Sequence, residues 1–131
     1  MRRHPSLHAW GREHHAALSL ARSLREAETP EQRVAARIRL RQLGPVLIAH
    51  FADEEARLCA LLRTLGRPDW ADRLRREHEL LRAGLASAAD ETLQELGQAL
   101  GEHVRFEDRE LYPFLEAKAG DAALQALVSD T

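Results

Sequence analysis

Residues 93–114 read LQELGQALGEHVRFEDRELYPF, and this stretch decides the fold because its apolar residues recur every three or four positions. The members of the series are Leu93, Leu96, Leu100, Leu111 and Phe114. Such spacing is typical of a helix with one face against a core. His103 and Glu107 stand where the series predicts hydrophobic residues. The stretch therefore predicts a core-facing helix that carries an imidazole and a carboxylate on its buried side.

The same spacing recurs in three earlier stretches, so we predict four helices and a short helical tail. Between the prolines the chain is rich in Leu, Ala, Arg, Glu and Gln, which favour helices, and β-branched residues are scarce. The predicted helices span about Ser6–Ala27, Glu31–Leu65, Asp69–Ala88 and Asp90–Lys118, and the tail spans about Ala122–Val128. Because short connections make neighbours antiparallel, the predicted fold is an all-α, up-down-up-down four-helix bundle that forms one domain over residues 1–131.

Four positions mark helix starts or interrupt a helix. Thr29 and Asp90 are predicted to cap helix starts, and Pro30 suits a first turn, where its missing N–H costs nothing. Pro45 lies inside the second helix, where a proline removes one hydrogen bond and costs roughly 3 kcal/mol. The second helix is therefore expected to be kinked or divided there. The exposed apolar side of Gln32–Leu43 is a candidate surface for a dimer.

Each predicted helix carries a histidine where its apolar series predicts a hydrophobic residue, and two helices add a carboxylate one turn later. These residues are His14, His50, Glu54, His78, His103 and Glu107. Residues four apart share one helix face, about 6 Å apart along the axis, so each HxxxE pair points into the core. One such histidine is more often an ordinary core residue, and one such pair is more often an exposed ion pair. The coincidence in all four helices instead favours a metal site.

The donor atoms of these six residues restrict the kind of metal. A buried ionised group costs several kcal/mol unless it is paired, and a bound cation removes that cost. Imidazole nitrogen and carboxylate oxygen without a thiolate suit Fe, Mn or Zn, and two carboxylates can bridge two ions in a bundle core. The sequence therefore predicts a dinuclear site.

Composition limits the setting of this site. The chain has 131 residues, of which 31% are charged and 44% are hydrophobic, as in one ordinary soluble domain. Its 21 acidic and 19 basic residues nearly cancel, so the net charge of -2 gives no reason to expect nucleic acid or a membrane as partner. The single cysteine, Cys59, excludes an internal disulfide. No apolar signal core follows the basic start, so we expect a cytoplasmic protein.

The ordered pattern H, HxxxE, H, HxxxE resembles the hemerythrin-like, or HHE cation-binding, domain family. Four stretches carry the resemblance: REHHAAL at 12–18, HFADEE at 50–55, REHELL at 76–81 and HVRFEDRELYPFLE at 103–116. The resemblance implies a non-haem di-iron centre with an oxo or hydroxo bridge, in which Glu54 and Glu107 bridge and the histidines are terminal ligands. Zn or Mn are alternatives. A ferritin-like bundle is disfavoured because no histidine follows a glutamate by three positions.

Two departures from the oxygen-carrying members of that family bear on function. Those carriers have a second histidine four residues before the third-helix histidine, where this chain has Leu74. They also have an aspartate five residues after the fourth-helix histidine, which is Asp108 here, but Glu107 fits the i+4 spacing and the HHE pattern better. The missing histidine leaves an open position, which favours peroxide or NO chemistry over reversible oxygen carriage.

Several neighbouring residues receive secondary roles. His14 is preferred to His15 because it lies on the apolar face of its helix, which leaves His15 near the site or on the surface. His4 and His8 are predicted to be surface or tail residues. We expect Glu55, Glu77 and Glu110 either to be solvated or to orient a ligating imidazole. The residues predicted to be buried near the site are Trp10, Phe51, Cys59, Trp70 and Phe106.

Three functions remain open at this level. The protein binds O2, NO or peroxide in sensing, scavenging or iron handling; or it is a peroxide-decomposing di-iron enzyme; or it is a helical interaction module with adventitious metal. No general base or nucleophile is visible beyond the six site residues, so any catalysis would rest on the metal. A monomer and a homodimer are both compatible with the sequence.

Overall fold

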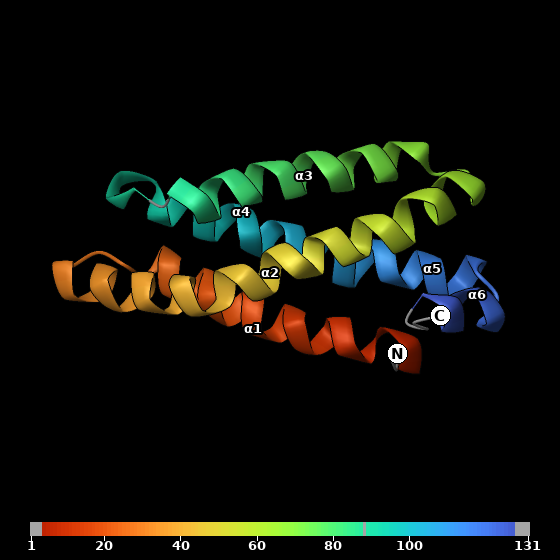
Figure 1. The fold of residues 1–131 in the computed structure, drawn as a ribbon, viewed down its shortest axis with the longest axis horizontal. Helices are drawn as coiled ribbons and strands as arrows, with labels where there is room; N and C mark the ends of the chain where they lie inside the picture. The colour runs from red at the N-terminus through yellow and green to blue at the C-terminus, as the bar shows by residue number, and fades with distance from the viewer. Residues whose placement is uncertain (1–3, 88, 128–131) are drawn as a thin grey trace.

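The computed structural model describes residues 4–87 and 89–127, which are helical and contain no strand (Figure 1). The long helices are α1 (His8–Arg25), α2 (Pro30–Thr64), α3 (Pro68–Ser87) and α4 (Leu93–Phe106). The shorter elements are η1 (Pro5–Leu7), η2 (Asp90–Thr92), the π-helical segment η3 (Glu107–Leu111), α5 (Tyr112–Lys118) and α6 (Asp121–Ala126). The all-helical prediction is confirmed. The predicted ends at Ala88 and Val128 lie outside the described residues.

The four long helices pack around a shared core. Helix α1 contacts α2 and α4, and α3 contacts the same two helices, as the ribbon shows (Figure 1). The residues of the predicted apolar series are buried or half-buried in all four helices. They form two apolar clusters, and along each long helix the site histidine lies between a residue of one cluster and a residue of the other. No helix in the described part of the chain is long and apolar enough to cross a membrane.

The predicted signals at helix ends are correct at α2 but not at η2. The Thr29 hydroxyl accepts a hydrogen bond from the Gln32 backbone N–H at 3.1 Å, and the Gln32 side chain accepts one from the Thr29 N–H at 2.9 Å. Asp90 does not cap a helix: it is the first residue of η2, and its carboxylate pairs with the Arg37 guanidinium at 2.5 Å. The carboxylate thus contacts a side chain of α2, and no side-chain cap hydrogen bond forms at the start of η2.

Helix α2 is continuous at its internal proline and ends at a glycine. The helix runs through Pro45 as one element, so of the two expected outcomes, a kink or a division, the division does not occur. Gly66, with a φ of 84°, ends the helix in a left-handed conformation that suits glycine. The Arg67 N–H then donates to the carbonyl of Leu62 at 2.8 Å, which turns the chain directly into α3.

Helices α1 and α4 are in close contact at Gly97. A Cβ atom there would lie 2.7 Å from the Ala21 carbonyl oxygen and 2.9 Å from the Arg25 backbone nitrogen. Only glycine therefore fits this contact without a shift of the backbone. The close approach fixes α4 against α1 two turns before the first polar residue of the core.

Candidate metal centre

The six residues predicted as ligands meet in the core. Each is at most 3% exposed, and together they form the polar layer between the two apolar clusters. Their side chains make two groups that share both carboxylates: His14, His50, Glu54 and Glu107 in the first, and Glu54, His78, His103 and Glu107 in the second. Within each group the candidate ligand atoms all lie within 4.8 Å of one another. The structure therefore brings together every residue that the sequence singled out for metal.

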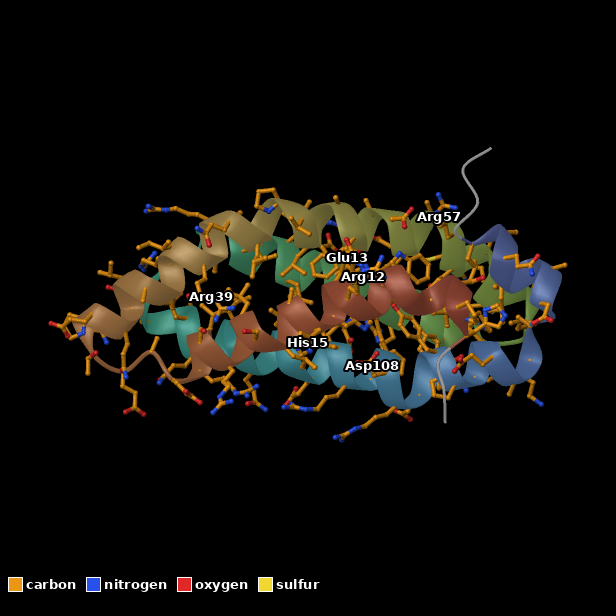
Figure 2. The ribbon with its side chains drawn as sticks, turned by 90° about the horizontal axis from the view of Figure 1, so that it is seen from below. Arg12, Glu13, His15, Arg39, Arg57 and Asp108 are labelled. Carbon is orange, nitrogen blue, oxygen red and sulfur yellow. The ribbon has the colours of Figure 1, made fainter. Side chains whose placement is uncertain are left out.

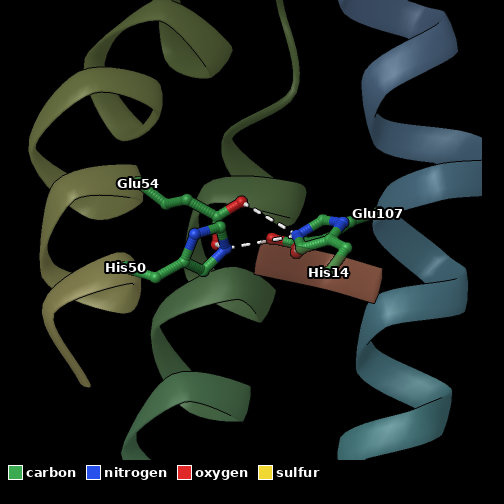
Figure 3. Close-up of side chains that lie close together, drawn as sticks. All are labelled: His14, His50, Glu54 and Glu107. Atoms are coloured by element: carbon green, nitrogen blue, oxygen red, sulfur yellow. Dashed lines mark hydrogen bonds and ion pairs between the residues drawn. The ribbon is translucent and has the colours of Figure 1, made fainter. Parts of the chain in front are cut away.

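The first group joins α1, α2 and η3 (Figure 3). Nε2 of His14 lies 2.8 Å from Oε1 of Glu107, and Nε2 of His50 lies 3.2 Å from Oε1 of Glu54. The two Nε2 atoms are 3.2 Å apart. Both imidazoles thus present the same ring nitrogen to one small volume between two carboxylates.

The second group repeats this arrangement on α3 and α4. Nε2 of His78 lies 3.2 Å from Oε1 of Glu54, and Nε2 of His103 lies 3.4 Å from Oε2 of Glu107. The two Nε2 atoms are 3.1 Å apart. Because Glu54 and Glu107 contact histidines of both groups, each lies where a carboxylate that bridges two ions would lie.

A second set of carboxylates, here called the outer carboxylates, contacts the opposite ring nitrogen of each histidine. The Nδ1–oxygen distances are 2.9 Å for His14–Asp108, 2.8 Å for His50–Glu13, 3.3 Å for His78–Glu55 and 2.7 Å for His103–Glu77. A carboxylate at Nδ1 places the ring proton there, which leaves the Nε2 lone pair free for a metal. All four imidazoles are thus oriented as metal ligands.

The outer carboxylates also follow a regular order around the bundle. Each is a sequence neighbour of one of the six core residues, and each reaches a histidine on another element. Glu13 of α1 contacts α2, Glu55 of α2 contacts α3, Glu77 of α3 contacts α4, and Asp108 of η3 contacts α1 (Glu13 and Asp108 are labelled in Figure 2). The contacts form a closed ring that holds the long helices in register at the site.

The buried carboxylate oxygens of Glu54 and Glu107 show whether these residues fit a metal pair. Oε1 of Glu54 and both carboxylate oxygens of Glu107 are buried and have no hydrogen-bond partner among the described residues. An unsatisfied buried polar atom costs roughly 1–3 kcal/mol, and more when it is charged. With the proton on Nδ1, the paired Nε2 atoms would also face each other as acceptors. Cations between these nitrogens and oxygens remove both penalties, so the residues fit a metal pair.

The pKa shifts of the buried histidines and carboxylates are consistent with cation binding at this site. Burial opposes a charge on His14, but attraction to Glu107 and the hydrogen bond with Asp108 raise its pKa well above the ordinary value. Burial likewise opposes a charge on Glu54, but its contacts with three histidines hold its pKa well below the ordinary range. For His103, the carboxylates outweigh burial and raise the pKa to about 10. The carboxylates therefore stabilise positive charge, whether carried by protons or by metal ions.

The other residues predicted near the site differ in whether they contact it. Glu55 and Glu77 contact imidazoles as expected, whereas Glu110 is exposed. His15 is exposed beside the buried His14 (Figure 2), and Asp108 contacts the outer face of His14 rather than the core oxygens. Four of the residues predicted to be buried near the site are buried, and Trp70 is half-buried; the four are Trp10, Phe51, Cys59 and Phe106.

The N-terminal histidine His4, predicted as a surface or tail residue, is 20% exposed, and its Nε2 lies 3.1 Å from Oδ1 of Asp121. Its backbone N–H donates to the Glu116 carboxylate at 2.5 Å, so the chain before α1 is attached to α5 and α6. The side chain of His8 lies outside the described residues.

Tyr112, like Glu13, is a residue of the site that was not predicted from the sequence. Its side chain is 0% exposed, and its hydroxyl lies 2.5 Å from Oε2 of Glu54. On a regular helix, Tyr112 is about 100° away from Leu111, which continues the apolar series. In the structure, the π-helical turn of η3 adds one residue per turn and restores Tyr112 to the buried face. The four consecutive charged residues at 107–110, three carboxylates and one arginine, interrupt the apolar series just before Tyr112.

Comparison with known proteins gives one finding. The family model described as the hemerythrin HHE cation binding domain matches residues 6–115. This range contains all six core residues and all four outer carboxylates. No curated protein and no solved structure shows significant similarity to the chain.

Proposed function

The chain belongs to the hemerythrin HHE cation-binding domain family, and we propose on this premise that its core holds two iron ions. The observation that carries the proposal is the sharing of Glu54 and Glu107 between two histidine pairs. Each ion would take two Nε2 atoms and one oxygen of each shared carboxylate. Nitrogen and oxygen donors of this kind also accept Zn and Mn, which are the alternatives for the bound metal.

The proposal includes the scaffold that the sequence predicts. We take residues 1–131 as one domain with an up-down-up-down antiparallel four-helix bundle. The three-residue connection between α2 and α3, and the contacts of α1 and α3 with α2 and α4, support this topology. In such a bundle, each helix contributes its histidine from the same layer.

We further propose that the metal pair interacts with O2, NO or peroxide. Such a ligand must be small, because every core residue of the centre is at most 3% exposed. Leu74, one turn before His78, is buried and offers no ligand atom, so an ion held by His78 and His103 would have a position left for an external molecule. A pocket of about 230 Å³, which Arg73, Glu77 and His103 help to line, provides an approach to this side.

The side chains have defined parts in this function. When bound, iron supplies the redox and Lewis-acid chemistry. The chain orients the imidazoles through the outer carboxylates and excludes bulk water with apolar residues on either side of the layer. Phe51, whose ring stacks on that of His78 at 4.4 Å between centroids, belongs to this dry wall. The residues therefore favour binding of a small diatomic molecule or peroxide over that of a bulky substrate.

The test combines metal content with absorption spectra. We expect iron-loaded protein to contain two ions per chain and to change its visible spectrum with at least one of O2, NO and peroxide. His78→Gln should lose iron and the spectral response, while His15→Gln, on the exposed side of α1, should keep both. A loaded protein whose spectrum is indifferent to all three molecules contradicts the proposed ligand class. If the wild type decomposes peroxide and His78→Gln does not, the protein is a peroxide-decomposing enzyme.

A further inference from the structure

Tyr112 places a phenol oxygen inside the first histidine group. Its hydroxyl donates a hydrogen bond to Oε2 of Glu54 at 2.5 Å and lies 3.1 Å from Nε2 of His14. Both of these atoms are candidate metal ligands, and the side chain of Tyr112 is 0% exposed. The phenol oxygen is thus within contact distance of two donors of one proposed ion, although phenols are not part of the H, HxxxE, H, HxxxE pattern.

The fold holds this oxygen in place. The Tyr112 backbone N–H donates to the carbonyl of Glu107, five residues earlier, so the π-helical turn puts the two side chains on one face. The Tyr112 ring lies nearly parallel to that of His14, at 8° and 5.1 Å, and stacks on Trp10 at 6.1 Å. The Trp10 indole is itself held by a hydrogen bond to Asp53 at 3.0 Å. The phenol is therefore fixed before any metal arrives.

We propose that the phenol oxygen of Tyr112 is a further protein ligand of the ion held by His14 and His50. The inference rests on the proposed function, since it requires that ion. Protein nitrogen and oxygen ligands bind at about 2.0–2.2 Å, so two of them at a right angle on one ion lie about 3 Å apart. The distances from the phenol oxygen to Glu54 and His14 bracket that separation. On binding, the oxygen–metal bond replaces the O–H bond, and the proton passes to solvent.

This ligand makes the two ions unequal. The ion at His14 and His50 gains a fifth protein donor, whereas Leu74 supplies none to the ion at His78 and His103. An external molecule is then taken up at the second ion, beside the pocket that His103 lines. Tyr112 thereby directs the small ligand to one side of the centre.

A single experiment decides the point because Tyr112 is the only tyrosine in the chain. The protein is loaded with ferric iron alone, and its visible absorption and resonance Raman spectra are recorded with and without ring-deuterated tyrosine. We expect a phenolate-to-iron charge-transfer band whose enhanced ring vibrations shift with deuteration. Tyr112→Phe should lose the band and keep two irons per chain. Trp10→Phe, which removes the indole N–H that donates to Asp53 but leaves the phenol in place, should keep the band.

The outcomes separate the two proposals. Wild-type protein that holds two ferric ions without any deuterium-sensitive ring vibration overturns the assignment of Tyr112 and leaves the metal site intact. Wild-type protein that binds no iron overturns the proposed function instead. Should Tyr112→Phe fail to fold or load, the isotope shift in the wild type still decides, since no other residue contributes a phenol.

Discussion

Oε1 of Glu77 lies 2.7 Å from Nδ1 of His103, and this contact joins α3 to α4 at the centre. On the other side of the same carboxylate, the Arg73 guanidinium donates to Oε2 at 2.8 Å. The imidazole is thus fixed in a tautomer and orientation that direct Nε2 toward Glu107. An outer carboxylate with no direct access to the metal is therefore expected to influence how tightly the metal is bound.

Replacement of Glu77 should weaken metal binding. Loss of a carboxylate behind a ligating histidine typically costs 10–100-fold in affinity, and we expect a loss of about that size for Glu77→Ala. Glu77→Gln, which keeps a hydrogen-bond acceptor but not the charge, should have a metal affinity between those of Glu77→Ala and the wild type. Competition with a calibrated chelator measures the affinity. Glu79→Ala, on the exposed side of the same helix, is the matched control, and an equal loss in that variant would refute the role of Glu77.

His14 and His15 should differ sharply although they are neighbours. His14 is 2% exposed and faces Glu107, whereas His15 is exposed. We expect His14→Ala to lower the metal content below two ions per chain and His15→Ala to leave it unchanged. Elemental analysis of untagged protein after gel filtration measures both. Equal metal content in the two variants would remove His14 from the ligand set.

The stability of metal-free protein should depend on pH in a defined direction. Despite burial, attraction to carboxylates raises the pKa of His103 from 6.5 to about 10. A raised pKa stabilises the folded state below the unfolded pKa, and this stabilisation is lost as the pH rises through the folded value. We therefore expect the free energy of unfolding in urea to fall between about pH 6.5 and pH 10. A stability that stays constant or rises over that window contradicts the assignment.

Metal binding should have the opposite pH dependence for the same reason. A metal ion must displace the protons that the histidines hold, so affinity rises with pH and binding releases protons. Calorimetry in two buffers of different ionisation enthalpy counts these protons. An affinity independent of pH would show that the imidazoles do not bind the metal.

Gly97→Ala tests the packing that positions α4. A Cβ atom there would meet the backbone of α1 at 2.7 Å, and overpacking of this kind typically costs about 1–3 kcal/mol. Gly11→Ala is the matched control because nothing lies within 4 Å of its Cβ position, and alanine in a helix is about 1 kcal/mol more favourable than glycine. We expect the first variant to be less stable than the wild type and the second to be at least as stable. Denaturant unfolding compares them.

The sequence predicts the helices and the six core residues because both depend on one regular spacing. A histidine such as His50 occupies a position of an apolar series, and the spacing of that series predicts that the position is buried. The helix cap at Thr29 is equally local and was predicted. Asp90 was predicted wrongly as a cap because its partner, Arg37, lies on another helix, and no local pattern records that contact.

The missed parts of the site depend on tertiary contacts or on irregular backbone. Glu13 adjoins His14 in the sequence but contacts His50 of α2, so its role follows from how the helices pack. Tyr112 reaches the centre only because η3 is π-helical, and the regular spacing that revealed Glu107 places Tyr112 off the buried face. The regular helical spacing therefore predicts the six core residues but not Tyr112.

The proposed pair of iron ions is tested most directly by an anomalous-scattering map from crystals of iron-loaded protein, recorded at the iron edge. Two peaks are expected between Glu54 and Glu107, one beside Nε2 of His14 and His50 and the other beside Nε2 of His78 and His103. A map with no peak in this layer, or with iron bound only elsewhere on the chain, would contradict it.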